Sequence, residues 1–191
     1  MKITDKTKRK AEKQRLKRIK AYYRVYDFGD VIYNTKGEKY ILVLKKQLNE
    51  QFYFIVQDQY GNLLLQKFVY GESVHMVNVA LDGRQYAQNS NIFDVWIKEA
   101  ETILSKYTKG YYKRMKVGTV SDNNGTENCK LVLKKEHQGK YYFVLKFDSC
   151  KYRVAKVVYF VEYNTVILST AEFNRNRRLF ASWIDEAKTQ S

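Results

Sequence analysis

The sequence predicts an α+β protein made of two tandem repeats of one small antiparallel module, an SH3-like β-barrel or curved sheet closed by a C-terminal helix, with a basic N-terminal helix in front. Three blocks recur with an offset of 89 residues: those at Gly29, Leu42 and Phe52 return at Gly118, Leu131 and Tyr141. A WIKEA block at 96–100 recurs as WIDEA at 183–187. Such self-similarity indicates a repeated structural unit. The chain has no proline, so the copies are expected to join directly.

Residues 5–23 lack glycine and proline and predict the helix that precedes the first copy. Leu16, Ile19 and Tyr23 follow i, i+3, i+7 spacing, which gives a narrow apolar stripe on a cationic helix. We expect this stripe to dock on the first module. Because the cores are expected downstream, we also expect removal of residues 1–20 to leave the protein folded.

Each copy then alternates short apolar runs with turn residues, the pattern of a β-meander that ends in a helix. In the first copy the predicted strands are 29–34, 39–46, 51–58, 62–69 and 73–80, and the helix is 91–107. In the second copy the strands are 117–121, 128–136, 140–147, 151–159 and 162–168, and the helix is about 173–188. The predicted domains are therefore 1–23, 24–107 and 108–191. Trp96 and Trp183 are expected at equivalent buried positions.

The charge indicates a polyanionic partner. The net charge is +15, and the segment from Met1 to Arg24 carries eleven Lys or Arg against Asp5 and Glu12. A basic segment of this kind points to nucleic acid, or to a ribonucleoprotein or acidic protein. No apolar run reaches the length of a membrane span and no basic segment leads into an apolar core of the signal-peptide type, so we expect no membrane partner and a cytoplasmic location.

Cations and tyrosines interleave, a combination that can contact phosphates and stack on bases. Exposed rings suit RNA better than duplex DNA, and no recognition-helix motif is visible. The candidate nucleic-acid-binding residues are Lys6, Lys8, Arg9, Lys10, Lys13, Arg15, Lys17, Arg18, Lys20, Tyr22, Arg24, Lys109, Tyr111, Lys113, Arg114, Arg175, Arg177 and Arg178.

Residues that could carry catalysis are few. His75 and His137 are the only histidines, and neither belongs to a recognisable triad; Cys129 and Cys150 form no CxxC pair and are expected to be reduced thiols. No phosphate-binding loop, HExxH or carboxylate cluster occurs. We therefore predict no catalytic residue, metal site or cofactor. The shared Glu99 and Glu186 are expected to be surface charges of the helices.

One segment of the first copy resembles the opening of MazF/PemK-type ribonuclease toxins. Residues 29–33 read Gly-Asp-Val-Ile-Tyr and residues 36–44 continue Lys-Gly-Glu-Lys-Tyr-Ile-Leu-Val-Leu. The family begins with a Gly-Asp-Ile/Val strand, a loop and a second strand. The resemblance implies an SH3-like barrel and, as an alternative function, a metal-independent endoribonuclease.

The features together favour a non-enzymatic binding protein over an enzyme. We expect the basic helix and the Tyr/Lys surfaces of the modules to engage nucleic acid or a ribonucleoprotein. A Lys-rich, duplicated small protein without an enzyme motif also fits a phage or mobile-element inhibitor of a host nucleic-acid-processing nuclease of the CRISPR type. Cleavage of an RNA pool in EDTA would instead favour the endoribonuclease.

Overall fold

Two curled antiparallel sheets of five strands each, with helices at both ends of the chain, form the architecture. The structure is a computed structural model that describes residues 5–34, 36–70, 76–122, 127–160 and 164–190. The chain divides into two compact units, Met1–Thr102 and Ile103–Ser191. The predicted α+β class, with two half-barrel sheets in tandem and an N-terminal helix, is confirmed.

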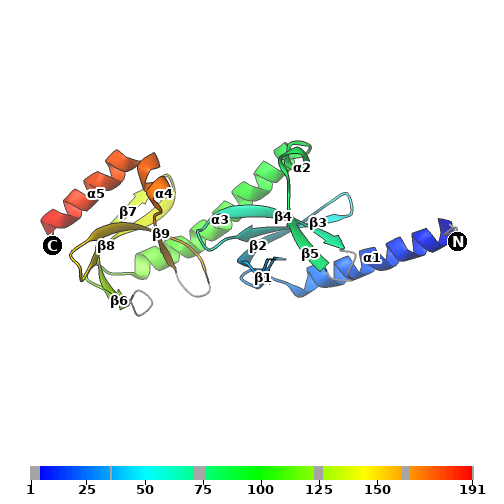
Figure 1. The fold of residues 1–191 in the computed structure, drawn as a ribbon, viewed down its shortest axis with the longest axis horizontal. Coiled ribbons are helices and arrows are strands. Elements are labelled where there is room, and N and C mark those ends of the chain that lie inside the picture. The colour runs from blue at the N-terminus through cyan, green and yellow to red at the C-terminus, as the bar shows by residue number, and fades with distance from the viewer. Residues whose placement is uncertain (1–4, 35, 71–75, 123–126, 161–163, 191) are drawn as a thin grey trace. The chain divides into compact units, whose positions relative to one another are not determined.

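The first unit opens with a long helix and continues as a meander. Its elements are α1 (Asp5–Val25), β1 (Val31–Tyr33), β2 (Lys39–Leu48), β3 (Gln51–Gln57), β4 (Leu63–Tyr70), β5 (Met76–Ala80), α2 (Gly83–Ala87) and the first half of α3 (Ser90–Arg114). Strands that follow one another in the chain are neighbours in the sheet (Figure 1). Residues 73–75 of the predicted fifth strand lie outside the described residues.

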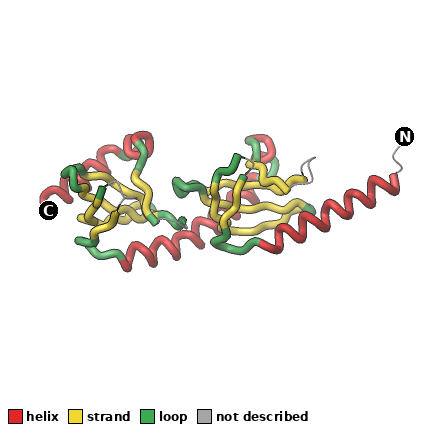
Figure 2. Tube along the Cα trace, turned by 60° about the horizontal axis from the view of Figure 1, so that its bottom comes forward, coloured by secondary structure: helices red, strands yellow, loops and turns green. Residues whose placement is uncertain are grey.

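The second unit repeats this order after the last turns of α3. Its elements are β6 (Val120–Asp122), β7 (Asn128–His137), β8 (Lys140–Phe147), β9 (Tyr152–Val157), β10 (Thr165–Ile167), α4 (Thr170–Arg175) and α5 (Arg177–Gln190). The sheet order again follows the chain, and Figure 2 shows its strands as one curved layer. Residues 162 and 163, predicted to begin the last strand, are not among those described.

Both faces of the first sheet are covered, which explains the unbroken apolar run of β3. Successive strand side chains point to opposite faces. Phe52 and Phe54 pack with Ile19 of α1 on one face, called here the first face. Tyr53 points to the second face, where its ring centroid lies 5.5 Å from that of Trp96 in α3. The sheet is therefore covered by the preceding helix as well as by the closing helix that the sequence predicts.

The second unit has the same two-faced core. Phe143 of β8 packs with Tyr112 of α3 on the first face. Tyr142 packs on the second face, with its ring centroid 5.5 Å from that of Trp183 in α5. Trp96 is 8% exposed and Trp183 is 7% exposed. The predicted burial of the two tryptophans at equivalent positions is confirmed.

A lysine pair in β2 ties the first sheet to both of its helices. Lys45 Nζ donates to the Tyr23 carbonyl at 3.3 Å, in the last turn of α1, and to the Tyr26 carbonyl directly after the helix. The next residue points to the other face, where Lys46 forms an ion pair with Glu99 of α3 at 2.6 Å. Adjacent lysines thus reach two different helices because a strand alternates its side chains.

The same pair recurs in β7 of the second unit. Lys134 Nζ donates to the Met115 carbonyl at 2.7 Å, directly after the end of α3. Lys135 forms an ion pair with Glu186 of α5 at 2.7 Å. Glu99 and Glu186, which the sequence predicted to be surface charges of the helices, therefore form ion pairs that hold the closing helix of each unit to its sheet.

Helix α3 is longer than predicted and belongs to both units. It continues to Arg114, whereas the sequence predicted an end at Tyr107. Tyr111 and Tyr112 pack against the first face of the second sheet, so tertiary contacts stabilise the extra turns. Gly110 lies inside the helix despite its lower helix propensity.

The short helix α2 was not predicted, and the last helix, predicted as one element from about residue 173 to 188, is divided into α4 and α5. Both α2 and α4 have a side chain that caps their start. Asp82 accepts a hydrogen bond from the Gln85 backbone at 2.8 Å at the start of α2. Ser169 and Glu172 form a capping box at the start of α4. Such caps satisfy backbone N–H groups that a helix start leaves free.

Helix α1 is part of the first core and is not a detachable arm. Ile19 is buried in the cluster that holds Phe54, and Leu16 packs against that cluster. The expectation that removal of residues 1–20 leaves the cores intact is therefore wrong. The charges of α1 have to be tested by substitution, because deletion would also remove Leu16 and Ile19.

Candidate functional site

One face of α1, turned roughly 110° around the helix from the apolar stripe, carries a continuous row of cations, called here the α1 row. Its five members are exposed and alternate three and four residues apart: Lys10, Lys13, Lys17, Lys20 and Arg24. At 1.5 Å of rise per residue, the row spans about 21 Å. No Asp or Glu occurs from residue 13 to residue 25, so this part of the helix presents positive charge alone.

The remaining α1 candidates flank this row. Lys8, Arg9, Arg15 and Arg18 are exposed, and the side chain of Lys6 lies outside the described part of the structure. The whole helix has ten Lys or Arg against Asp5 and Glu12. Like charges this close repel one another, so the helix depends on its packing against the sheet.

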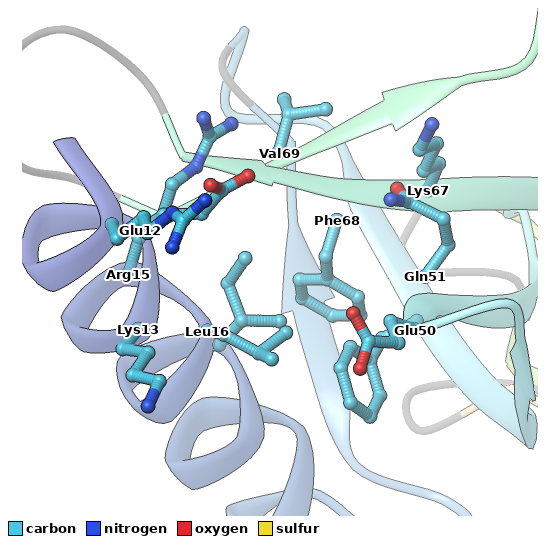
Figure 3. Close-up of a pocket in the computed structure, with 12 residues that line it drawn as sticks. Glu12, Lys13, Arg15, Leu16, Glu50, Gln51, Lys67, Phe68 and Val69 are labelled. Carbon is cyan, nitrogen blue, oxygen red and sulfur yellow. The ribbon is translucent and has the colours of Figure 1, made fainter. Parts of the chain in front are cut away.

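A groove of about 630 Å³ lies between α1 and strands β3 and β4. Leu16 and Phe68 form part of its apolar floor and point toward one another (Figure 3). Glu12 lies beside Arg15 at the helix side, and Glu50 adds a second carboxylate to the lining (Figure 3). The groove therefore mixes both signs of charge, and the α1 row is the more strongly cationic surface.

The two tyrosines proposed as stacking residues face the cores. The Tyr22 ring lies 5.4 Å from that of Phe68 and 4.9 Å from that of Tyr26. Burial raises the pKa of Tyr22, and its hydrogen bond with Tyr26 raises it further. The Tyr111 ring lies 6.2 Å from that of Phe143, and burial raises the pKa of Tyr111. These two rings are therefore half-buried against the cores, and little of their surface is open to a base.

The last turns of α3 carry exposed cations in the second unit. Lys109, Lys113 and Arg114 are all exposed there. Lys106, which the predicted set omits, is exposed on the same helix. The signal that would have found it is the repeat offset, because residue 106 lies 89 residues after Lys17.

The basic residues at the start of the last helix lie elsewhere. Arg175 ends α4, and Arg177 and Arg178 begin α5, with all three exposed. Helix α5 packs on the second face through Phe180, whereas the end of α3 packs on the first face through Tyr112. The structure therefore separates these arginines from the α3 cations by the thickness of the sheet.

The histidines and cysteines considered for catalysis form no cluster among the residues that the structure describes. The His137 ring lies 6.3 Å from that of Trp183 in an edge-on contact, and His75 lies outside the described residues. Cys129 is buried and Cys150 is exposed, and both are free thiols. Among the described residues, no group of three His, Cys, Asp or Glu side chains could hold a metal ion.

The segment that resembles the MazF/PemK opening forms β1 and the start of β2. Gly29 has φ +90°, and its N–H donates to the Leu42 carbonyl at 2.9 Å. In the second copy Gly118 has φ +93° and donates to Leu131 at 2.7 Å. Glycine adopts positive φ without the steric cost that a side chain brings. The shared glycine thus serves the turn into the sheet in both units.

None of the helices in the described part of the chain is both long enough and apolar enough to cross a membrane. The cytoplasmic location stays a prediction.

Comparisons with protein-family models, with curated proteins and with solved structures found no match to this chain.

Proposed function

We propose that this protein binds nucleic acid without cleaving it, and that the α1 row contacts the phosphate backbone. The observation that carries this proposal is the regular row from Lys10 to Arg24, exposed along one face of a helix held to a sheet. Cations placed in this way replace condensed counterions on successive phosphates, and the released ions drive binding.

The chemistry of α1 fits a nucleic acid better than a membrane. Its apolar residues Leu16, Ile19 and Tyr23 are used by the first core, so the helix has no free apolar face to insert into lipid. Interfacial helices bind by burying such a face. A repeating polyphosphate needs only the cations, which are what the helix exposes.

Phosphate contacts position a protein on nucleic acid but do not read its sequence. With Tyr22 and Tyr111 packed against the cores, we expect electrostatic binding to dominate and base preference to be weak. A guide RNA within a nuclease complex offers the same backbone, so the inhibitor role inferred from the sequence falls within this proposal.

The test compares the wild-type protein with a variant in which all five cations of the α1 row become glutamine. Binding of fluorescein-labelled RNA and DNA is measured by anisotropy between 50 and 200 mM KCl, as single strands and as duplexes. Each phosphate contact adds about 0.7 to 0.9 to the slope of log affinity against log salt. Five contacts predict a slope difference of about 3.5 to 4.5, or roughly 100- to 500-fold between these salt concentrations.

A matched control removes five exposed cations that lie off α1. Its substitutions to glutamine are at Lys36, Arg84, Lys98, Lys140 and Lys151. If the control lowers the slope of log affinity against log salt as much as the α1 variant does, binding depends on net charge. The α1 row is then rejected as the binding site. Each sample is also incubated with an RNA pool in EDTA, where cleavage would support the endoribonuclease in place of the binder.

A further inference from the structure

We infer that the end of helix α3 forms a second phosphate-binding face equivalent to the end of the α1 row, so that the protein holds a nucleic-acid backbone at two places. This inference rests on the proposed function and extends it to the second unit. The cations concerned lie within Ile103–Ser191, and the α1 row lies within Met1–Thr102.

The two helices carry the same cations at the same repeat positions. Residues 17–24 read KRIKAYYR, and residues 106–113 read KYTKGYYK. With the offset of 89 residues, three cations correspond in pairs: Lys17 with Lys106, Lys20 with Lys109 and Arg24 with Lys113. All six side chains are exposed. Among the other α1 cations only Arg9 has a cationic counterpart, Lys98, whereas Lys13 corresponds to Thr102 and Arg15 to Leu104.

The tyrosine pair next to these cations sets which way they point. Tyr23 stacks on Phe54 with ring centroids 5.7 Å apart, and Tyr112 stacks on Phe143 at the same 5.7 Å. A helix turns 100° per residue, so the three cations of each triplet emerge roughly 60° to 120° around the helix from this tyrosine, where all of them are exposed. Each triplet spans about 10 Å along its helix, the length over which one strand passes about three phosphates.

A half-buried lysine of the sheet holds each of these helix ends in place. Lys45 Nζ donates to the carbonyls of Tyr23 and Tyr26 at the C-terminal end of α1 and just after it, and lies 5.3 Å from the centre of the Tyr23 ring. Lys134 Nζ reaches the Met115 carbonyl and lies 4.4 Å from the centre of the Tyr112 ring. In each unit, therefore, one lysine of the sheet hydrogen-bonds to the end of the helix, and three cations of the helix are exposed to solvent. A binding face on a fixed element loses little conformational entropy when it binds.

Folding alone does not account for the matched triplets. Cations three or four residues apart on a helix repel and destabilise it. The helix dipole favours a cation in the last turn, which covers Arg24 and Lys113 but not the four lysines that precede them. A charge arrangement that opposes helix stability and still occurs in both copies points to contact with an anion.

The test neutralises one triplet at a time in the full-length protein. The variants are K17Q/K20Q/R24Q, K106Q/K109Q/K113Q and the combination of both. Each triplet is expected to lower the slope of log affinity against log salt by about 2 to 3 for a labelled 30-base-pair duplex. The combined variant is expected to show the sum of the two decreases. Because repulsion is relieved, thermal melting followed by circular dichroism is expected at or above the wild-type temperature.

The control K36Q/K140Q/K151Q removes the same charge from exposed positions off both triplets. The second face is rejected if K106Q/K109Q/K113Q lowers the slope no more than this control does, while K17Q/K20Q/R24Q still lowers it. That result leaves the proposed function intact. Absence of salt-dependent binding by the wild-type protein would reject the proposed function and the second face together.

Discussion

Replacing Phe180 by alanine tests the two-faced core of the second unit. Phe180 is 2% exposed, and its ring lies 5.2 Å from that of Trp183 and 5.6 Å from that of Tyr142. It therefore joins α5 to the second face of the sheet. Truncation removes the contacts of a whole ring at a place where the sheet cannot collapse onto the helix without losing its own pairing.

The expected destabilisation follows from the burial of this ring. Replacing a buried phenylalanine by alanine costs about 3 to 5 kcal/mol of unfolding free energy. A unit the size of Ile103–Ser191 has a total stability of roughly 4 to 13 kcal/mol. With a urea m-value of about 1.5 kcal/mol per molar, the unfolding midpoint should fall by about 2 to 3 M.

The chain provides its own reporters for a urea titration. Trp96 and Trp183 are the two tryptophans, with one in each unit. In a Trp96→Phe background, fluorescence reports the second unit, and Phe180→Ala should lower its midpoint. In a Trp183→Phe background, fluorescence reports the first unit, and the matched change Phe93→Ala should act there, because Phe93 is 1% exposed. If Phe180→Ala shifts the unfolding midpoint by less than about 0.5 M urea, the loss is below about 1 kcal/mol at the same m-value. That result would refute the role of Phe180 in the core of the second unit.

Three further predictions concern single contacts. Glu50→Gly should raise the unfolding free energy of the first unit by about 1 kcal/mol, because Glu50 has φ +60° where the second copy has Gly139 at φ +71°; an unchanged melting temperature would contradict this. Lys134→Met should lower the stability of the second unit by about 1 to 2 kcal/mol in urea titrations, since the carbonyl after α3 loses its donor; no change would show that water replaces it. The Tyr86 hydroxyl donates to Asp94 at 2.6 Å, and this hydrogen bond, helped by burial, raises the pKa of Tyr86 to about 12. Since the unfolded pKa is about 10, this contribution is full below pH 10 and is lost as pH rises through about 12. Melting temperatures of wild type and Tyr86→Phe should thus differ at pH 8 and converge near pH 12, and a constant difference would refute the linkage.

The repeated architecture could be read from the sequence because it depends on local patterns. The blocks around Leu42 and Leu131, the apolar runs of β3 and β8 and the two tryptophans are local signals, and each forms the predicted element. Helix ends were less accurate. The extra turns of α3 exist because Tyr111 and Tyr112 pack on a sheet that follows later in the chain, a contact that no local pattern contains.

The direction of each side chain was decided by the tertiary structure alone. In a strand that is apolar on both faces, alternation does not say which helix covers which face. The sequence could count the lysines and locate the basic segment, since charge is a property of composition. It could not tell that Lys45 and Lys134 reach inward to helix ends while Lys17 and Lys106 stay exposed. That difference arises because strand register and helix packing orient the side chains, and they form only when residues distant in the chain meet.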